Sequence, residues 1–461
     1  MATRVLTRWD PEDAAFWDGE GRSVASRNLA ISIPALTLAF AVWMVWSVVV
    51  VNLPHVGFRF STNQLFWLAA LPALCGATLR IFYAFMVPMF GGRVWTTLST
   101  ASLLLPALGI GFAVQDPDTS YPTLLLLALL CGLGGGNFAS SMANISFFFP
   151  ASQKGVALGL NAGLGNLGVP VAQFVVPLVI IGGLFGTISG APQVWSGPGE
   201  SREIWLQNAG FVWVPAIAVA TLAAWFGMND IPGARASFAE QAVIFVRKHN
   251  WLMSWLYLGT FGSFIGYSAG FPLLLQTEFP AVDATRYVFL GPLVGALMRP
   301  LGGWLADRLG GARVTFWNFL VMVLAVAAVL LCLPTPASGG SLPGFVVAFL
   351  LLFLTTGIGN GSTFRMIPVI FLTERMRDAA GKGPQANEQA VKDANKEAAA
   401  VLGFTSAVGA YGGFFIPKSY GTSIAMTGGP EAALYVFMFF YCTCILITWW
   451  YYSRKNAEMP C

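Results

Sequence analysis

The chain has 461 residues, of which 56% are hydrophobic and only 10% are charged. This composition excludes an ordinary water-soluble globular domain, in which about a quarter of the residues are charged. The net charge of +4 does not indicate nucleic-acid binding, because the distribution of basic residues along the chain explains it. Long apolar runs follow each other from end to end, and their lengths predict membrane-spanning helices rather than barrel strands.

The first 27 residues are polar and are expected to form a cytoplasmic tail. Their aromatic residues, Trp9, Phe16 and Trp17, are typical of a segment that lies on the membrane surface. No cleavable signal sequence is expected, because the first apolar run follows this charged tail. The six cysteines lie mostly in apolar runs without metal-ligand spacing. Neither disulfides nor a metal or cofactor site is therefore expected.

Twelve apolar segments are predicted to cross the membrane as helices. They cover residues 28–52, 64–88, 94–114, 121–149, 155–184, 210–228, 250–276, 287–306, 314–333, 344–372, 398–424 and 432–452. A polar linker over residues 231–249 separates six segments from six. The predicted fold is therefore an all-α membrane protein with a six-helix bundle over residues 28–230 and another over residues 250–461.

Lysine and arginine predict the orientation, because basic residues concentrate on the cytoplasmic side of membrane proteins. With the N-terminus inside, 18 of the 25 basic residues fall in inside segments, 4 in outside segments and 3 within spans. Both termini are therefore expected in the cytoplasm.

The second span carries one charged side chain, Arg80, in an otherwise uncharged stretch from Gln64 to Pro88. An arginine inside an apolar helix costs about 3 kcal/mol or more unless it faces a cavity or a partner. The eighth span repeats the pattern Leu-x-Gly-Ala-x-x-Arg and ends it at Arg299. Two isolated cations in equivalent helices predict one anion site. The alternative for Arg80 is a side chain that extends to the membrane surface.

Further matches indicate that the two halves are repeats. Gly136-Asn137-Phe138 in the fourth span matches Gly359-Asn360-Gly361 in the tenth, and Ala157-Leu-Gly159 in the fifth matches Val401-Leu-Gly403 in the eleventh. Parallel six-helix repeats are the organisation expected of a major-facilitator transporter, whose substrate binds between the halves.

A polar loop motif lies between the eighth and ninth spans. Gly303-Trp-Leu-Ala-Asp307-Arg308-Leu-Gly-Gly-Ala-Arg313 resembles the cytoplasmic loop motif of the major facilitator superfamily. This resemblance implies that Asp307, Arg308 and Arg313 form a charge clasp that stabilises one gated state. The first-half counterpart is reduced to Phe90-Gly91-Gly92-Arg93.

The fifth span contains a glycine pattern and a buried amide. Gly163-Leu-Gly165-Asn-Leu-Gly168 spells GxGxxG, but it does not follow a strand, so it predicts no dinucleotide site. Glycines at 155, 159 and 163 recur every fourth residue, which favours either close helix packing or gating. The amide of Asn166 needs a partner, and an anion would accept its hydrogen bonds.

Two stretches resemble the signature of nitrate/nitrite porters of the NarK type. They are Gly134-Gly-Gly-Asn-Phe-Ala-Ser-Ser-Met-Ala-Asn-Ile-Ser-Phe-Phe-Phe-Pro150 and Gly159-Leu-Asn-Ala-Gly-Leu-Gly-Asn-Leu-Gly168. The resemblance extends from the Trp9-Asp-Pro-Glu-Asp segment to Ile416-Pro-Lys418. It implies a monomer in a bacterial cytoplasmic membrane whose partners are nitrate, nitrite and the lipid bilayer.

The resemblance also implies a set of site residues. Arg80 and Arg299 would bind the anion, and the site would be lined by Phe138, Asn166, Tyr257 and Phe261. The gating glycines would be Gly134, Gly135, Gly136, Gly159, Gly163, Gly165, Gly168, Gly403, Gly409 and Gly412. Tyr257 and Phe261 share one helix face, where they either enclose a planar anion or simply pack. Ala162 stands where family members carry glycine.

Arg365 departs from the family, in which the matching residue is neutral. Through the repeat it corresponds to Met142, one turn beyond Phe138. It either draws anions toward an inner vestibule or pairs with the cytoplasmic surface, and the sequence leaves both interpretations open.

The leading functional hypothesis is exchange of nitrate for nitrite. Nitrate–proton symport is the alternative, but no aspartate or glutamate occurs in residues 28–115, 119–199, 309–373 or 398–430 to carry a proton. An intramembrane enzyme would need a nucleophile beside a base, whereas His55 and His249 lie in or near polar loops. Export of bulky cations conflicts with the cationic residues within the spans.

Overall fold

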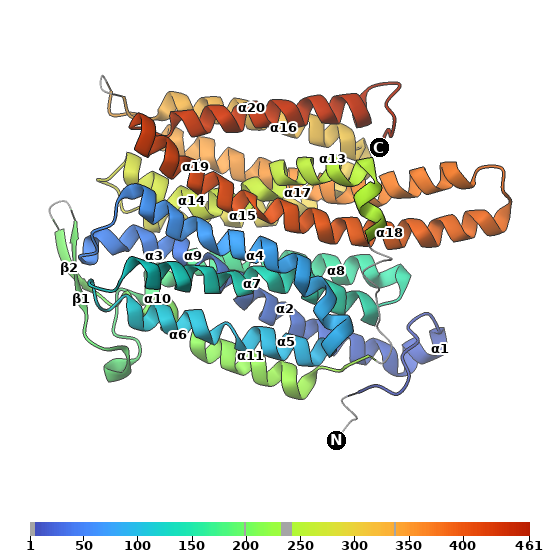
Figure 1. The fold of residues 1–461 in the computed structure, drawn as a ribbon, viewed down its shortest axis with the longest axis horizontal. Helices are drawn as coiled ribbons and strands as arrows, with labels where there is room; N and C mark the ends of the chain where they lie inside the picture. The colour runs from blue at the N-terminus through green and yellow to red at the C-terminus, as the bar shows by residue number, and fades with distance from the viewer. Residues whose placement is uncertain (1–4, 198–199, 232–241, 336–337) are drawn as a thin grey trace. The chain divides into compact units, whose positions relative to one another are not determined.

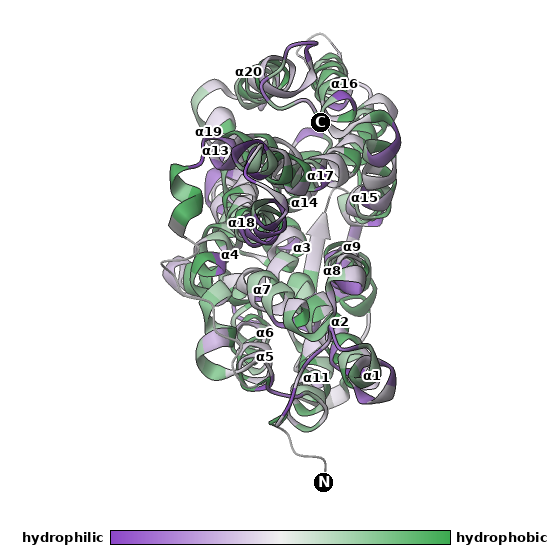
Figure 2. Ribbon diagram, turned by 90° about the vertical axis from the view of Figure 1, so that its right-hand side faces the viewer, coloured by the Kyte–Doolittle hydropathy of each residue, from purple (hydrophilic) through white to green (hydrophobic). Residues whose placement is uncertain are grey.

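The computed structural model describes residues 5–197, 200–231, 242–335 and 338–461. Within these residues, twelve helical segments are long and apolar enough to cross a membrane, which confirms the predicted class and number. They cover Ala14–Val56, Thr62–Phe90, Gly92–Ala113, Tyr121–Phe148, Ala151–Val179, Asn208–Gly227, Lys248–Glu278, Ala284–Leu309, Gly311–Cys332, Leu342–Ala379, Pro384–Thr427 and Glu431–Ser453. Figure 2 looks along the helices and shows hydrophobic residues over most of them.

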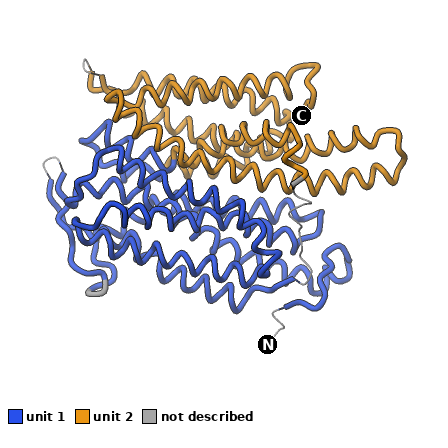
Figure 3. The backbone as a smooth tube through the Cα atoms, in the orientation of Figure 1, with its two compact units in different colours: residues 1–236, 268–289 blue, residues 237–267, 290–461 orange. Residues whose placement is uncertain are grey.

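The chain forms two compact units (Figure 3). Unit 1 comprises Met1–Ala236 and Ser268–Phe289, and unit 2 comprises Ser237–Tyr267 and Leu290–Cys461. Much of the predicted linker over residues 231–249 lies outside the described residues. Its described end contains the short helix η4 (Ala242–Val246) and the start of the seventh span.

Unit 1 contains the first six spans (Figure 1). Its elements are α1 (Ala14–Phe16), η1 (Trp17–Gly21), α2 (Arg22–Met44), α3 (Trp46–Asn52), η2 (Leu53–Val56), α4 (Thr62–Phe90), α5 (Gly92–Ala101), α6 (Leu104–Ala113), α7 (Tyr121–Phe148), α8 (Ala151–Asn166), α9 (Gly168–Val179), η3 (Gly186–Ser189), β1 (Gln193–Gly197), β2 (Glu200–Ile204), α10 (Asn208–Phe211), α11 (Trp213–Gly227) and η6 (Ala284–Arg286). β1 and β2 pair antiparallel, with Trp195 opposite Arg202.

Unit 2 contains most of the second half of the chain. Its elements are α13 (Lys248–Tyr257), η5 (Leu258–Gly262), α14 (Ser263–Glu278), α15 (Leu290–Leu309), α16 (Gly311–Cys332), α17 (Leu342–Ala379), α18 (Pro384–Ala410), α19 (Gly412–Thr427), α20 (Glu431–Thr448) and η7 (Trp449–Ser453). The residues of α14 from Ser268 onward belong to unit 1.

Serine side chains begin three of the spans. Ser61 and Gln64 form a reciprocal capping box at α4, which satisfies two backbone N–H groups that a helix start leaves unpaired. Ser120 accepts a hydrogen bond from the N–H of Thr123 at α7. Ser341 does the same for Gly344 at α17, so the equivalent fourth and tenth spans begin in the same way.

Glycines bring the second and fourth spans into contact within unit 1. A Cβ at Gly76 would lie 2.9 Å from the Cα of Gly135, and a Cβ at Gly135 would lie 2.8 Å from that of Gly76. Unit 2 repeats this arrangement, because a Cβ at Gly357 in α17 would lie 2.2 Å from the carbonyl oxygen of Gly295 in α15. Only residues without a side chain allow backbones to approach this closely.

The N-terminal tail packs on the end of the fourth span that the sequence predicts to be cytoplasmic. Trp17 is 6% exposed in a cluster with Phe148 and Phe149. The indole N–H of Trp9 donates to the carbonyl of Phe147, and a carboxylate oxygen of Glu12 accepts a hydrogen bond from the first N–H of α8 at 2.8 Å. These aromatic side chains therefore contact the end of the fourth span, and the expected location at the membrane surface stays a prediction.

Candidate substrate-binding site

Arg80 lies on α4 within the core of unit 1 and is 1% exposed. Its Nε donates to the carbonyl oxygen of Gly135 on α7 at 2.9 Å, a contact that the close approach of the two helices allows. Its guanidinium lies 4.7 Å from the ring centre of Phe138 and 5.2 Å from that of Trp43. Arg80 is thus buried deep in the unit, and the alternative of a side chain that extends to the membrane surface is excluded.

Arg299 lies on α15 in unit 2 and is half-buried. Its guanidinium lies 5.2 Å from the ring centre of Phe364 on α17. Its buried Nη1 has no hydrogen-bond partner among the described residues. The two arginines therefore share a chemistry, namely a cation that contacts a phenylalanine of the equivalent helix.

Tyr257 and Phe261 are both 1% exposed in unit 2. Their rings stack with centres 5.4 Å apart, and Tyr257 also lies 6.5 Å from Phe364. Tyr257 comes directly before the π-helical turn η5, and Phe261 lies within it; such turns are frequent at functional sites. Tyr257 thus connects the predicted aromatic pair to the ring that contacts Arg299.

The structure buries Asn166 at the end of α8, where it is 2% exposed and its Oδ1 has no partner among the described residues. A second amide on α8, Asn161, is fully buried and donates to the hydroxyl of Ser141 at 2.8 Å. Ser141 also bonds to Ser32 on α2. Sequence reasoning missed this chain of polar groups, although polar residues inside apolar spans are the signal that reveals it.

The predicted gating glycines fall into two groups. A Cβ at Gly134, Gly135, Gly136, Gly165, Gly168, Gly409 or Gly412 would lie within 3.0 Å of another part of its own unit. At Gly159, Gly163 and Gly403 it would meet no atom of the described residues within 4 Å. Within unit 1, side chains at positions 155, 159 and 163 would therefore meet no neighbouring described residue, and Leu160 beside them is 47% exposed.

The cytoplasmic loop motif forms an ion pair with the unusual arginine. Nε of Arg365 on α17 contacts a carboxylate oxygen of Asp307 at the end of α15, and both side chains are about half exposed. Arg308 stacks on Trp304 at 4.3 Å, whereas Arg313 is exposed. The contact with Asp307 favours the surface-pairing interpretation of Arg365.

The reduced counterpart of this motif also holds a carboxylate. Nε of Arg93 pairs with Asp230 at 3.0 Å, and the backbone N–H of Arg93 donates to the same carboxylate at 2.8 Å. Gly91 has a positive φ of 87°, and a Cβ there would lie 2.5 Å from Asp230. Gly91 thus leaves room for this carboxylate, whereas a Cβ at Gly92 would meet the side chain of Asn144. The short motif retains a clasp within unit 1.

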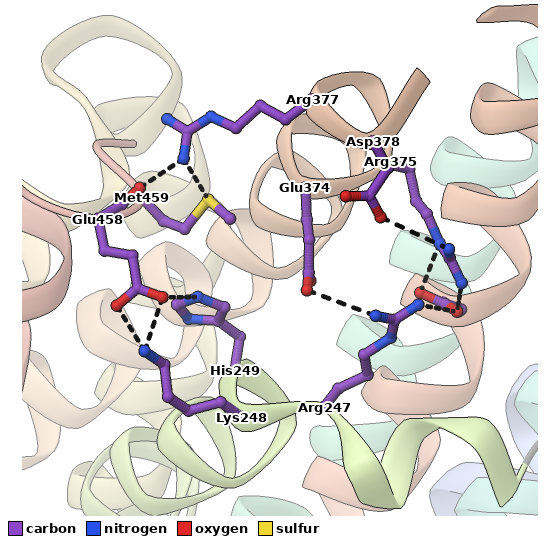
Figure 4. A network of polar contacts seen from close by, with 10 residues as sticks. Arg247, Lys248, His249, Glu374, Arg375, Arg377, Asp378, Glu458 and Met459 are labelled. Atoms are coloured by element: carbon purple, nitrogen blue, oxygen red, sulfur yellow. Dashed lines mark hydrogen bonds and ion pairs between the residues drawn. The ribbon is translucent and has the colours of Figure 1, made fainter. Parts of the chain in front are cut away.

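A second charge network gathers at one end of unit 2 (Figure 4). Glu397 on α18 accepts hydrogen bonds from both Arg247 and Arg375. Lys248 donates to Glu458 in the C-terminal segment, and this hydrogen bond, which outweighs partial burial, lowers the pKa of Glu458 below its usual value. The network ties the seventh, tenth and eleventh spans and the C-terminal segment together.

Comparison with known proteins identifies the family. The model of the Major Facilitator Superfamily matches residues 35–417. Nitrate/nitrite transporter NarU of Salmonella typhimurium is 52% identical over 98% of this chain and 97% of its own length. Probable nitrate/nitrite antiporter NarK2 of Thermus thermophilus is 46% identical over 99% of this chain and 98% of its own.

Solved structures show the same fold. A bacterial homologue of the human lysosomal transporter Spinster, in an inward-facing and occupied conformation, has a TM-score of 0.64 with 17% identity, over 92% of this chain and 96% of that one. The chain therefore belongs to the major facilitator superfamily and, within it, to the family of NarU- and NarK-type nitrate/nitrite transporters.

Proposed function

We propose that the chain exchanges nitrate for nitrite across the bacterial cytoplasmic membrane, with both termini in the cytoplasm. The observation that carries this proposal is the matching environment of Arg80 and Arg299. Each is a cation inside a span, each contacts a phenylalanine of the equivalent helix, and Arg80 is almost completely buried. The relatives are a nitrate/nitrite transporter and a probable nitrate/nitrite antiporter, which supports nitrate and nitrite as the substrates proposed here.

The proposed site suits a small planar anion. A guanidinium presents a flat fork of N–H donors that matches the oxygens of a planar oxyanion. Nitrate carries a single charge, so it needs few donors, and aromatic rings such as Phe138 and Tyr257 would flank its faces. In this proposal the same anion contacts Arg80 and Arg299, while Phe261 and Asn166 complete the lining.

Anion exchange explains the lack of carboxylates in most membrane segments better than proton symport does. A symporter needs a group that binds and releases a proton within the membrane, and residues 28–115, 119–199, 309–373 and 398–430 contain no aspartate or glutamate. Tyrosine is a poor carrier near neutral pH because its pKa lies near 10. The coupling is therefore proposed to be one anion for another.

Counterflow in proteoliposomes tests the function directly. Vesicles loaded with nitrite should take up labelled nitrate from outside, and vesicles loaded with chloride should take up far less. Vesicles without protein measure leakage. Equal uptake with and without internal nitrite would contradict exchange, and absence of nitrate uptake in every condition would contradict the substrate.

A further inference from the structure

Unit 1 contains a cavity of about 330 Å³ at the end that carries the β-hairpin, opposite α1 (Figure 1). The last turns of α9, the strand β2 and the turn η6 contribute its lining. It is separate from the proposed substrate site, since Arg80 and Phe138 do not line it. With the proposed orientation, this end of the unit faces the outside.

The polar side of the cavity has an excess of positive charge. Arg202 and Arg286 approach the same oxygen of Asp283, at 3.5 and 3.4 Å, so two cations share one carboxylate. The other oxygen of Asp283 already accepts hydrogen bonds from Thr285. The buried Nε of Arg202 has no hydrogen-bond partner among the described residues, so a donor remains for a ligand.

Asp283 is charged at neutral pH. Its partial burial raises its pKa, but the hydrogen bonds from Thr285 and the two arginines outweigh burial and hold the pKa below the usual value. One negative charge therefore faces two positive ones, and the cluster keeps a net charge of about +1.

The other side of the cavity is apolar and open to the surroundings. Phe174, Leu178 and Ile181 are 49%, 52% and 59% exposed at the end of the fifth span, and Phe174 packs edge-on against Phe289 at 5.1 Å. Apolar side chains exposed at the end of a membrane span contact lipid. The cavity therefore joins a cationic wall to a lipid-facing wall.

We propose that this cavity binds the headgroup of an anionic phospholipid. The phosphate would contact Arg202 and Arg286, because guanidinium groups match phosphate oxygens, and the acyl chains would run along Phe174, Leu178 and Ile181. Basic pockets beside membrane helices recognise anionic headgroups in this way. The proposal does not depend on which anion the protein transports.

Size and lining favour a lipid over a free anion. An ion of four atoms needs little more room than a water molecule, which occupies about 30 Å³, and it gains nothing from an apolar wall. A glycerophosphate headgroup with the start of two acyl chains uses both the volume and the exposed side chains. Free phosphate or nitrate is the alternative ligand, because either anion could also bind the two arginines.

Native mass spectrometry of the delipidated, full-length protein tests the site. Phosphatidylglycerol should bind about fivefold more tightly than phosphatidylcholine, as expected for one net charge near the surface. Arg286→Gln should reduce this preference to near unity, and Arg286→Lys should restore most of it. Asp283→Asn should strengthen phosphatidylglycerol binding, because it removes the competing anion and keeps an oxygen that can accept from Thr285.

Arg59→Gln is the matched control. Arg59 is also exposed in a loop of unit 1 that is expected to be outside, and it does not line the cavity, so its loss should leave the preference unchanged. All variants should elute and melt like the parent. A preference that survives Arg286→Gln, or one that weakens in Asp283→Asn, would overturn the site. Binding of glycerol 3-phosphate or nitrate as tight as that of the lipid would overturn the lipid as its ligand.

Discussion

Arg80 and Arg299 each contact a phenylalanine, but the two phenylalanines differ in position. Through the repeat that aligns Gly136 with Gly359, Phe138 corresponds to Gly361 and Phe364 corresponds to Ser141. The ring beside Arg299 thus lies one helical turn further along its helix than the ring beside Arg80. The pseudo-symmetric halves therefore present similar chemistry in different geometry.

Replacement of either arginine by lysine should reduce exchange at least tenfold although the charge is kept. Lysine has no planar fork, and loss of one hydrogen bond to a charged group costs about 1.5–3 kcal/mol. At position 80 it also lacks the Nε that donates to Gly135. The measurement is nitrite-driven nitrate uptake by Arg80→Lys and Arg299→Lys at matched protein density. Parental rates in both variants would show that charge alone suffices.

The two arginines of the proposed site could be predicted from the sequence, and Phe138 through the family resemblance, whereas their other aromatic partners could not. Charges within apolar runs are rare, so Arg80 and Arg299 are conspicuous. The chain has 37 phenylalanines and 16 tryptophans, and nothing in their spacing distinguishes Phe364 or Trp43 from ordinary lipid-facing or packing residues. These aromatic residues can be recognised as partners of the arginines only once the packing of α4 on α7 and of α15 on α17 is known.

At the scale of helices, a glycine contact positions the partner of Arg80. Ala at position 135 would place its Cβ 2.6 Å from the Trp43 ring and 2.8 Å from Gly76. Overpacking of this kind costs about 1–3 kcal/mol, and Gly135→Ala should therefore lower the melting temperature of the purified protein. It should also weaken exchange, because α7 moves away from Arg80.

Gly163→Ala is the matched control, because its Cβ would meet no atom within 4 Å. Alanine is favoured over glycine in a helix by about 1 kcal/mol, so this variant should melt at or above the parental temperature. A loss of stability at position 163 equal to that at position 135 would contradict the packing described for α8.

Element types were predictable, but some extents were not. The tenth and eleventh spans were expected to end at residue 372 and to begin at residue 398, yet α17 continues to Ala379 and α18 begins at Pro384. The ends of both helices run on side by side within unit 2 (Figure 1). Hydropathy indicates where a span leaves the membrane, but it does not indicate where the helix ends. The segment beyond is rich in Ala, Glu, Gln and Lys, which are good helix formers, so the helices continue. The hairpin of β1 and β2 has no apolar signal at all and was missed.

The ion pair between Lys248 and Glu458 should stabilise the C-terminal segment at neutral pH and be lost in acid. The hydrogen bond from Lys248 keeps the pKa of Glu458 below its usual value, so folding gains stability above the ordinary glutamate pKa of about 4.3 and loses it as the pH falls through the lowered pKa. Both side chains are about half exposed, so the effect is about 0–1 kcal/mol. Melting curves of the parent and Glu458→Gln should differ at pH 7 and converge in acid. A constant gap over this range would exclude the ionic contribution.

At the scale of the whole transporter, the proposed coupling depends on the distribution of charge. If one anion contacts both arginines, the empty carrier keeps two positive charges without the ligand that they share. Like charges repel strongly where the dielectric constant is low, so closure of the empty carrier is costly and a bound monoanion relieves part of that cost. The carrier should therefore return most easily with another anion bound, and exchange should be faster than net flux.

We expect the exchange to be electroneutral, with one nitrate moved for one nitrite and no proton. Nitrate uptake into liposomes that contain nitrite should be insensitive to a clamped membrane voltage and to an imposed pH gradient. The same liposomes without internal anion substrate should show only slow uptake. Since both substrates carry a single negative charge, any current would reveal unequal stoichiometry. Rapid uptake driven by a proton gradient alone would refute the exchange mechanism and establish symport, and would require a proton carrier other than a carboxylate in residues 28–115, 119–199, 309–373 and 398–430.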